Sequence, residues 1–177
     1  MTTKVYSTKD GKKFPSATQV LDGIWIGNQI VASSARFMKE KRIGGVVNCT
    51  PSLPNHFACD PKVQYLRVPV HDSLENRDIS SLGSYLPVAC HFIHKVRFLE
   101  NTPVLVHCQA GKQRSAAVVA AFLIMFYGCT PQSAMRLLLE RKRDVFHGGK
   151  HVNFAGALNK FYYTMNQGVS APATTRT

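Results

Sequence analysis

The sequence predicts a single α/β domain with a mostly parallel central sheet, and three observations lead to that prediction. Short apolar runs rich in β-branched residues alternate with longer apolar or amphipathic runs, and strands that alternate with helices form mainly parallel sheets. A length of 177 residues suits one domain with a full core. A composition of 45% hydrophobic and 18% charged residues is that of a soluble globular protein.

Four short runs are expected to be strands because they are apolar, partly β-branched and bounded by turn-forming or polar residues. They cover residues 24–27, 45–49, 63–70 and 104–106. The expected helices cover residues 32–41, 82–99 with a start or kink at Pro87, 116–127, a segment capped by Thr130 with Pro131 at its first position, and residues 152–165. Residues 116–127 contain no charge, Gly or Pro, so we expect them to form the buried central helix.

The two ends of the chain differ in composition from the predicted domain, which spans residues 18–165. Residues 1–17 form a basic extension whose lysines break up any signal peptide, and residues 166–177 form a small, polar, flexible tail. The five cysteines are an odd number without a CxxC pair, which indicates a reducing compartment rather than a disulfide framework. We therefore expect a cytoplasmic protein, with the nucleus left open, and the longest apolar run is too short to span a membrane.

The most informative run is PVLVHCQAGKQRS, residues 103–115. It places Cys108 at the end of a buried strand and Arg114, after five intervening residues, at the start of the apolar helix. Gly111 lets the connecting loop bend and lets its backbone approach a ligand. Successive N–H groups and a helix N-terminus form an anion-binding cradle, and Arg114 can hold two phosphate oxygens. The run therefore predicts covalent phosphate chemistry on a cysteine.

Cys108 is the expected nucleophile of this loop. A free cysteine is mostly protonated at neutral pH because its pKa is about 8.5, but a helix N-terminus and a nearby cation lower that value. The thiolate would attack phosphorus without a separate base, and Ser115 would donate a hydrogen bond that helps the sulfur leave. The rest of the expected phosphate-binding loop is His107, Gln109, Ala110, Gly111, Lys112 and Gln113.

Three other interpretations of these residues are less favoured. A lone cysteine in an apolar setting is more often an inert core residue, but here a Cys, a Gly, an Arg and a Ser are placed jointly. A nucleotide-binding P-loop would need Ser or Thr after Lys112, where this chain has Gln113. His91 and His94 have the spacing of a metal pair, but no further ligands are evident, so we expect neither a metal nor a cofactor.

The pattern His107-Cys108-x-x-Gly111-x-x-Arg114-Ser115 resembles the signature of cysteine-dependent protein phosphatases. The surrounding sequence is most similar to the dual-specificity phosphatase family, over roughly residues 18–165, through residues 24–28, 46–55, 65–72 and 153–161. The resemblance implies a four- to five-stranded sheet flanked by helices on both faces, and a pocket shallow enough for phosphotyrosine, phosphoserine and phosphothreonine. In some relatives a cysteine near the equivalent strand forms a protective disulfide with the nucleophile, so a disulfide between Cys49 and Cys108 is a hypothesis that the resemblance raises.

The leaving group needs a proton, which a carboxylic acid on a neighbouring loop usually supplies. Asp72 follows the predicted strand 63–70, and open α/β sheets bind ligands at that edge. Asp78 precedes a helical pattern, so it is better placed as an N-cap. We therefore prefer Asp72 as general acid and base, in agreement with the family comparison. The alternative for Asp72 is an exposed loop charge.

Several substrate classes are compatible with the sequence. The net charge of +12 suits a polyanionic partner, although solvated helix faces explain it as well. A phosphorylated protein is the leading substrate. Lys112 lies where lipid phosphatases often carry a basic residue, so a phosphoinositide comes second and an RNA 5′-phosphate third. A non-catalytic phospho-binding module is disfavoured because Cys108, Arg114 and Asp72 are all present. The sequence leaves the oligomeric state open, a homodimer included.

Overall fold

The fold is described from a computed structural model over residues 17–71, 76–146 and 154–167. The N-terminal extension up to residue 16 and the tail from residue 168 lie outside the described residues, as does Asp72. Among the helices of the described segments, none is both long and apolar enough to cross a membrane.

A five-stranded sheet forms the centre of the domain, in the order β1-β2-β5-β3-β4. The strands are β1 (Ala17–Leu21), β2 (Ile24–Gly27), β3 (Gly45–Asn48), β4 (Gln64–Arg67) and β5 (Val104–His107). All neighbouring strands are parallel except β1, which pairs antiparallel with β2. The predicted α/β fold with a mostly parallel sheet is therefore confirmed. The predicted strands omitted β1, whose half-buried residues at the sheet edge carry little hydrophobic signal.

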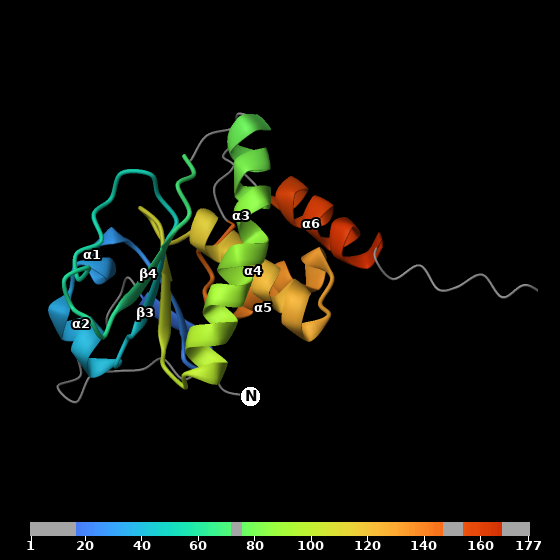
Figure 1. Cartoon of the computed structure of the whole chain (residues 1–177). Helices are drawn as coiled ribbons and strands as arrows, with labels where there is room; N and C mark the ends of the chain where they lie inside the picture. The colour runs from blue at the N-terminus through green and yellow to red at the C-terminus, as the bar shows by residue number, and fades with distance from the viewer. Residues whose placement is uncertain (1–16, 72–75, 147–153, 168–177) are drawn as a thin grey trace, which may run out of the picture.

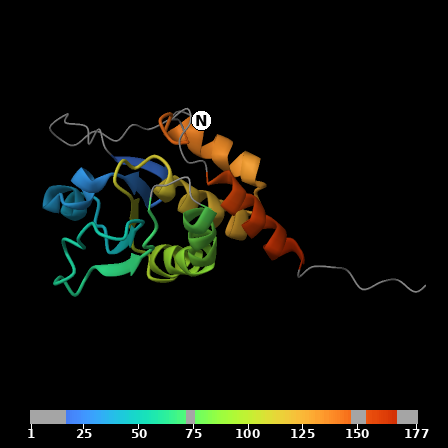
Figure 2. The ribbon, with the colours of Figure 1, turned by 90° about the horizontal axis from the view of Figure 1, so that it is seen from above.

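Helices cover both faces of the sheet (Figures 1 and 2). One face carries α1 (Gln29–Ala32) and α2 (Ala35–Glu40). The other carries α3 (Asn76–His94) with its π-helical continuation η1 (Lys95–Leu99), α4 (Arg114–Tyr127), α5 (Pro131–Arg141) and α6 (Ala155–Gln167). The helix α4 is buried from Arg114 to Ile124 and is packed by α3, α5 and α6. It is the buried central helix that its uninterrupted apolar sequence predicted.

The side chains of β5 alternate between the two faces, as the period of a strand requires. Val104 and Val106 belong to the larger hydrophobic cluster, beneath α3 and α4. Leu105 belongs to the smaller cluster beneath α1 and α2, where Trp25 and Phe37 meet edge to face at 5.4 Å between ring centroids. The next two residues continue the alternation, so His107 lies on the α1 side and Cys108 on the α4 side.

Two helix predictions were wrong in their bounds, and so was the N-cap predicted for one of these helices. The run 32–41 is divided at Ser33 and Ser34, because the Ser34 side chain accepts from Phe37 N at 3.2 Å and caps a new helix. The helix predicted from residue 82 begins at Asn76 and contains Pro87 without ending there. Asp78 is therefore the third residue of α3 rather than its N-cap, and its carboxylate lies near the positive end of the helix.

Candidate active site

The loop between β5 and α4 depends on a glycine with a left-handed backbone. Gly111 has φ +70°, and a Cβ built there would lie 2.8 Å from both the carbonyl carbon and the oxygen of Gly27. Real Cβ atoms do not approach backbone so closely, because their van der Waals radii would overlap. The loop therefore packs directly against the end of β2, which only glycine permits at this position.

Three backbone hydrogen bonds fix the loop to its surroundings. Gln29 N, at the start of α1, donates to Gln109 O at 3.2 Å. Phe146 N, after α5, donates to Lys112 O at 3.1 Å. Within α4, Ala117 N donates to Gln113 O at 2.8 Å. The loop is therefore held from the α1 side, from the α5 side and by the helix that follows it.

Cys108 lies at the start of this loop and is only 1% exposed. Gly111 N donates to Sγ at 3.3 Å, and Ser115 Oγ lies 3.3 Å from Sγ with either atom able to donate. When the hydroxyl donates, both contacts place positive hydrogens on the sulfur, which favours a negative charge there.

Arg114 is the first residue of α4 and is 3% exposed. Its Nη1 donates to Val70 O at 2.9 Å. This bond joins the start of α4 to the segment that leaves β4, two residues before Asp72. The predicted residues Cys108, Arg114 and Ser115 are thus brought together, whereas the general acid predicted at Asp72 lies outside the described residues.

His107, the residue before Cys108 in the chain, is buried on the α1 side, and its Nδ1 has no hydrogen-bond partner within the described segments. The pKa of His107 is lowered from 6.5 to about 4, mainly by burial. Electrostatic interactions with His56, Arg67 and Arg114 contribute to this lowering, whereas the Cys108 backbone opposes it. The imidazole is therefore uncharged at neutral pH.

Cys49 lies immediately after β3, beside the end of β5. Its backbone N donates to His107 O at 2.8 Å, and its side chain is fully buried. Burial raises the pKa of the Cys49 thiol, and the charge of Cys108 raises it further, against the opposing effect of Arg114. The disulfide between Cys49 and Cys108 stays a prediction.

The ion pairs beside Lys112 were not predicted by any pattern in the sequence. Asp144 Oδ1 is 2.5 Å from Lys142 Nζ, and Asp144 Oδ2 is 4.0 Å from Lys112 Nζ. The Lys142 side chain is 7% exposed, whereas Lys112 and Asp144 are about half exposed. Lys112 therefore reaches solvent from the loop with a carboxylate nearby. Nothing in the spacing of residues 112 and 144 predicts this contact.

A second group of contacts that the sequence did not reveal fixes the segment after β3. Arg67 Nη1 donates to the carbonyls of Thr50 and Leu53, both at 2.9 Å, and Arg67 Nη2 donates to Asn55 Oδ1 at 3.1 Å. The buried Asn48 side chain also donates to Leu53 O and to Asn55 Oδ1, at 2.9 and 2.8 Å. These hydrogen bonds hold residues 50–55 in one conformation beside the loop.

The fold and the loop together define a class of protein: a parallel-sheet α/β domain with a buried cysteine between its central strand and its central helix. Residues 24–163 match the family described as "Dual specificity phosphatase, catalytic domain". The chain belongs to this family.

Known proteins similar to the chain include relatives with the same description. It is 32% identical over 128 residues to dual specificity protein phosphatase Mpk3 of Drosophila melanogaster, covering 72% of this chain and 30% of that protein. It is 28% identical over 158 residues to human dual specificity protein phosphatase 6, covering 89% of this chain and 39% of that protein. The chain thus spans well under half the length of these curated relatives. The crystal structure of human DUSP28 has a similar fold, with a TM-score of 0.72 at 23% identity, covering 86% of this chain and 96% of that one.

Proposed function

We propose that this chain is a protein phosphatase that hydrolyses phosphotyrosine, phosphoserine and phosphothreonine through a cysteinyl-phosphate intermediate. The observation that carries the proposal is the Cys108 sulfur held in an anion-binding loop, with Gly111 N and Ser115 Oγ each 3.3 Å away. Membership of the dual specificity phosphatase family supports the same activity.

In the first step, the Cys108 thiolate attacks phosphorus from the side opposite the leaving oxygen. The S–P bond forms as the P–O bond breaks, and Asp72 gives its proton to the leaving alkoxide or phenoxide. The loop N–H groups and the Arg114 guanidinium bind the equatorial oxygens, where negative charge is spread in the transition state.

In the second step, water attacks the phosphorus of the cysteinyl phosphate. The Asp72 carboxylate takes a proton from that water, the S–P bond breaks, and inorganic phosphate is released. The electron pair of the broken bond returns to sulfur, where a hydrogen bond from Ser115 stabilises the thiolate. No cofactor or metal takes part in either step.

The chemistry needs Cys108 as a free thiol, which agrees with a reducing compartment such as the cytoplasm. All five cysteines are free thiols: Cys49, Cys59, Cys90, Cys108 and Cys129. Cytoplasmic localisation is part of this proposal, and immunofluorescence of the tagged chain, scored against nuclear and secretory markers, tests it.

A phosphoinositide phosphatase is the second candidate, because Lys112 lies in the phosphate-binding loop with its side chain 47% exposed. A free ammonium group at the rim of the loop would bind a second phosphate of a head group. The nearby Asp144 carboxylate reduces that attraction, which is why we rank a phosphoprotein first. RNA 5′-phosphate hydrolysis follows, supported only by the net charge of +12.

The deciding experiment compares four substrates at equal concentration: a phosphotyrosine peptide, a phosphothreonine peptide, a phosphoinositide and a 5′-triphosphorylated RNA. We expect both peptides to be hydrolysed fastest, and Cys108→Ser to abolish turnover. A rapid acid quench of the wild type should trap phosphate on the peptide that contains Cys108. Cys59→Ser, at an exposed cysteine, is the matched control and should keep full activity. No turnover of any of the four by folded wild-type protein would refute the enzyme, and would favour the phospho-binding module.

A further inference from the structure

A separate pocket adjoins the phosphate-binding loop on the α1 side of the sheet. It has a volume of about 360 Å³, and its walls come from α1, from the segment after β3 and from His107 at the end of β5. Two wall residues are connected to the loop itself. Gln29 N donates to Gln109 O at 3.2 Å, and His107 directly precedes Cys108. A molecule held at Cys108 is therefore within a few residues' reach of this pocket.

The walls of the pocket are held in place before any ligand binds. The Arg67 and Asn48 side chains bind the Leu53 carbonyl, as described above, and so fix the wall that includes Leu53 and Pro54. On the opposite wall, Asn28 Oδ1 accepts from Ile30 N at 3.0 Å and from Val31 N at 3.1 Å, which fixes the start of α1. A pocket with fixed walls loses little conformational entropy when a ligand binds.

The walls of the pocket combine aliphatic side chains with the polar residues Gln29, Ser33, His56 and His107. Ile30, Ala32, Leu53 and Pro54 contribute aliphatic surface, and Ile30 is 65% exposed. None of the described residues that line the pocket is a Lys, Arg, Asp or Glu. Because burial keeps His107 neutral at physiological pH, it adds no charge. In a chain with a net charge of +12, the described walls of this pocket carry no lysine or arginine to bind a second anionic group.

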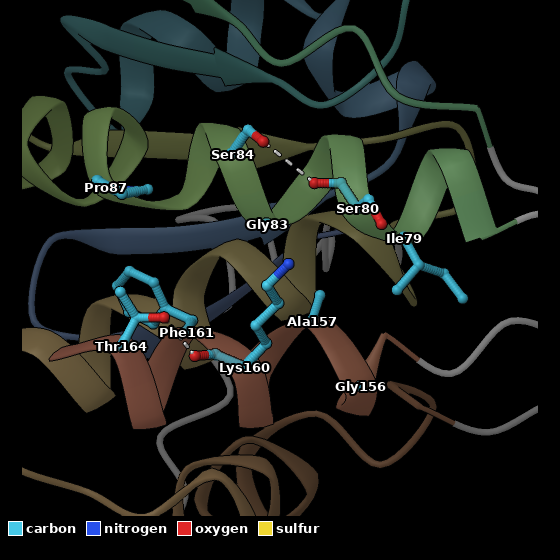
Figure 3. A pocket seen from close by; sticks show the side chains of 10 residues that line it. All are labelled: Ile79, Ser80, Gly83, Ser84, Pro87, Gly156, Ala157, Lys160, Phe161 and Thr164. Atoms are coloured by element: carbon cyan, nitrogen blue, oxygen red, sulfur yellow. Dashed lines mark hydrogen bonds between the residues drawn. The ribbon is translucent and has the colours of Figure 1, made fainter. Parts of the chain in front are cut away.

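A second pocket, the α3–α6 groove, lies between these two helices and is lined by residues from 79–87 and 156–164 (Figure 3). It is smaller, at about 220 Å³, and the small residues Gly83 and Gly156 are among those that line it. Neither residue belongs to the phosphate-binding loop or to the segments hydrogen-bonded to it. Gly83 and Gly156 therefore do not link the groove to the phosphate-binding loop. The α1-side pocket is linked to that loop through the hydrogen bond of Gln29 and through His107.

We propose that the α1-side pocket binds an uncharged, apolar side chain that flanks the phosphoresidue in a phosphoprotein substrate. This inference rests on the proposed phosphatase function and narrows its substrate class. The phosphate is bound by the charged loop, and the neighbouring side chain is recognised by Ile30, Leu53 and Pro54. An extended peptide advances about 3.3–3.6 Å per residue, so the recognised position lies within three residues of the phosphoresidue.

The test measures kcat/KM for phosphotyrosine peptides that differ at one position, from three residues before to three after the phosphotyrosine. Each position carries Leu, Gly or Asp in an otherwise identical peptide. At one position we expect Leu to exceed Gly by about tenfold, from burial of the aliphatic side chain, and Asp to be no better than Gly. In the Ile30→Asp variant the Leu-to-Gly ratio should fall to about twofold, because a charge then lines the pocket.

Two further variants test whether the Leu-to-Gly ratio of kcat/KM depends on this pocket. Leu53→Ala removes a wall side chain while it keeps the carbonyl that Arg67 binds, and it should lower the ratio about threefold. Leu99→Asp is the matched control, because Leu99 is a similarly exposed aliphatic residue on η1, outside the pocket. It should keep the wild-type ratio. If Ile30→Asp unfolds the chain, Leu53→Ala alone decides.

The outcomes separate this inference from the proposed function. In one outcome, the wild type hydrolyses p-nitrophenyl phosphate in a Cys108-dependent way and yet shows no preference for Leu at any peptide position. That result would refute the proposed role of the pocket, while the proposed phosphatase function would still hold. A preference for Asp, for a second phosphoresidue or for a phosphoinositide head group would also overturn it, since the walls would then select charge. Absence of turnover of every phosphoester refutes both.

Discussion

Two consecutive residues at the end of β5, His107 and Cys108, lie on opposite sides of one sheet and have opposite surroundings. Cys108 lies on the α4 side, where Gly111 N and Ser115 Oγ contact its sulfur and where Arg114, the first residue of α4, is buried. His107 lies on the α1 side, where it is uncharged and lines a pocket with aliphatic walls. Because successive side chains of a strand point to opposite faces of the sheet, residues joined by a single peptide bond lie in these two environments.

The difference suggests that the two sides of the sheet have different functions. The α4 side concentrates hydrogen-bond donors and positive charge, which suits an anion and its transition state. The pocket on the α1 side offers aliphatic surface, and no Lys, Arg, Asp or Glu is among the described residues that line it, which suits selection of a neighbouring side chain. Chemistry and selectivity should therefore be separable by mutation, and each prediction below tests one side against the other.

The largest effect should come from Arg114→Lys. Lysine cannot place two parallel N–H groups on the phosphate, nor keep the Arg114 contact with Val70 O, so we expect kcat/KM to fall roughly a thousandfold. Steady-state kinetics on the Leu-flanked and Gly-flanked peptides checks this. The preference between the two peptides should survive, because the α1 side is untouched. Arg136→Lys, at an exposed residue of α5, is the control. A loss smaller than tenfold would contradict the role given to Arg114.

The second prediction concerns Asp72→Asn, which should lower kcat on phosphopeptides about a hundredfold. The loss should be much smaller for p-nitrophenyl phosphate, whose leaving group needs little protonation. Asp78→Asn is the comparison, with the melting temperature measured alongside because Asp78 is 6% exposed. If Asp78→Asn loses activity in a folded protein while Asp72→Asn keeps it, the general acid is Asp78.

His107 should make the stability of the fold depend on pH. Its pKa lies near 4 in the folded protein and near 6.5 when unfolded, so between these values the unfolded state binds more protons. Stability is therefore lost as pH falls through this window, by about 2 kcal/mol between pH 7 and pH 5. Urea denaturation at several pH values measures the slope. His107→Gln should flatten it, whereas His91→Gln should not. An unchanged slope in His107→Gln would exclude this origin.

Gly111→Ala should damage the α4 side without removing a reactive group. The added Cβ would lie 2.8 Å from Gly27 backbone atoms, so the loop must shift, and we expect a tenfold to thirtyfold loss of kcat/KM together with about 1–2 kcal/mol of stability. Gly83→Ala is the matched control, because a Cβ there meets nothing within 4 Å. In the helix α3 it should stabilise by about 0.5–1 kcal/mol. Full activity in Gly111→Ala would show that the loop tolerates the displacement.

The smallest effect is expected at Lys112. Lys112→Ala should lower phosphoinositide turnover about fivefold and peptide turnover less than twofold, because only the head group offers a second phosphate to the ammonium group. Asp144→Asn should act in the opposite direction on the lipid, since it removes the carboxylate 4.0 Å from Lys112. Parallel assays on vesicles and peptides measure both. Equal effects on the two substrates would remove Lys112 as a selectivity residue.

Predictions from the sequence were most accurate where the information is local. The helix after the loop, the strand before it and the group formed by Cys108, Arg114 and Ser115 lie within one stretch of chain, so their spacing alone determines their arrangement. Bounds failed where short-range hydrogen bonds override hydrophobic period, as at Ser34, and where a helix begins earlier than its apolar pattern, as at Asn76 before Asp78. The edge strand β1 was missed because all of its residues except Val20 are only half-buried.

The sequence alone determined the α/β class and predicted a phosphate-binding loop with a reactive cysteine, since a strand, a glycine turn and a helix N-terminus follow one another within thirteen residues. Only the tertiary structure decided what surrounds the loop. The Arg67 and Asn48 hydrogen bonds, the Asp144 carboxylate near Lys112 and the pocket beside His107 join segments far apart in the chain. Such contacts depend on how parallel strands and helices pack, and no spacing within one segment specifies them.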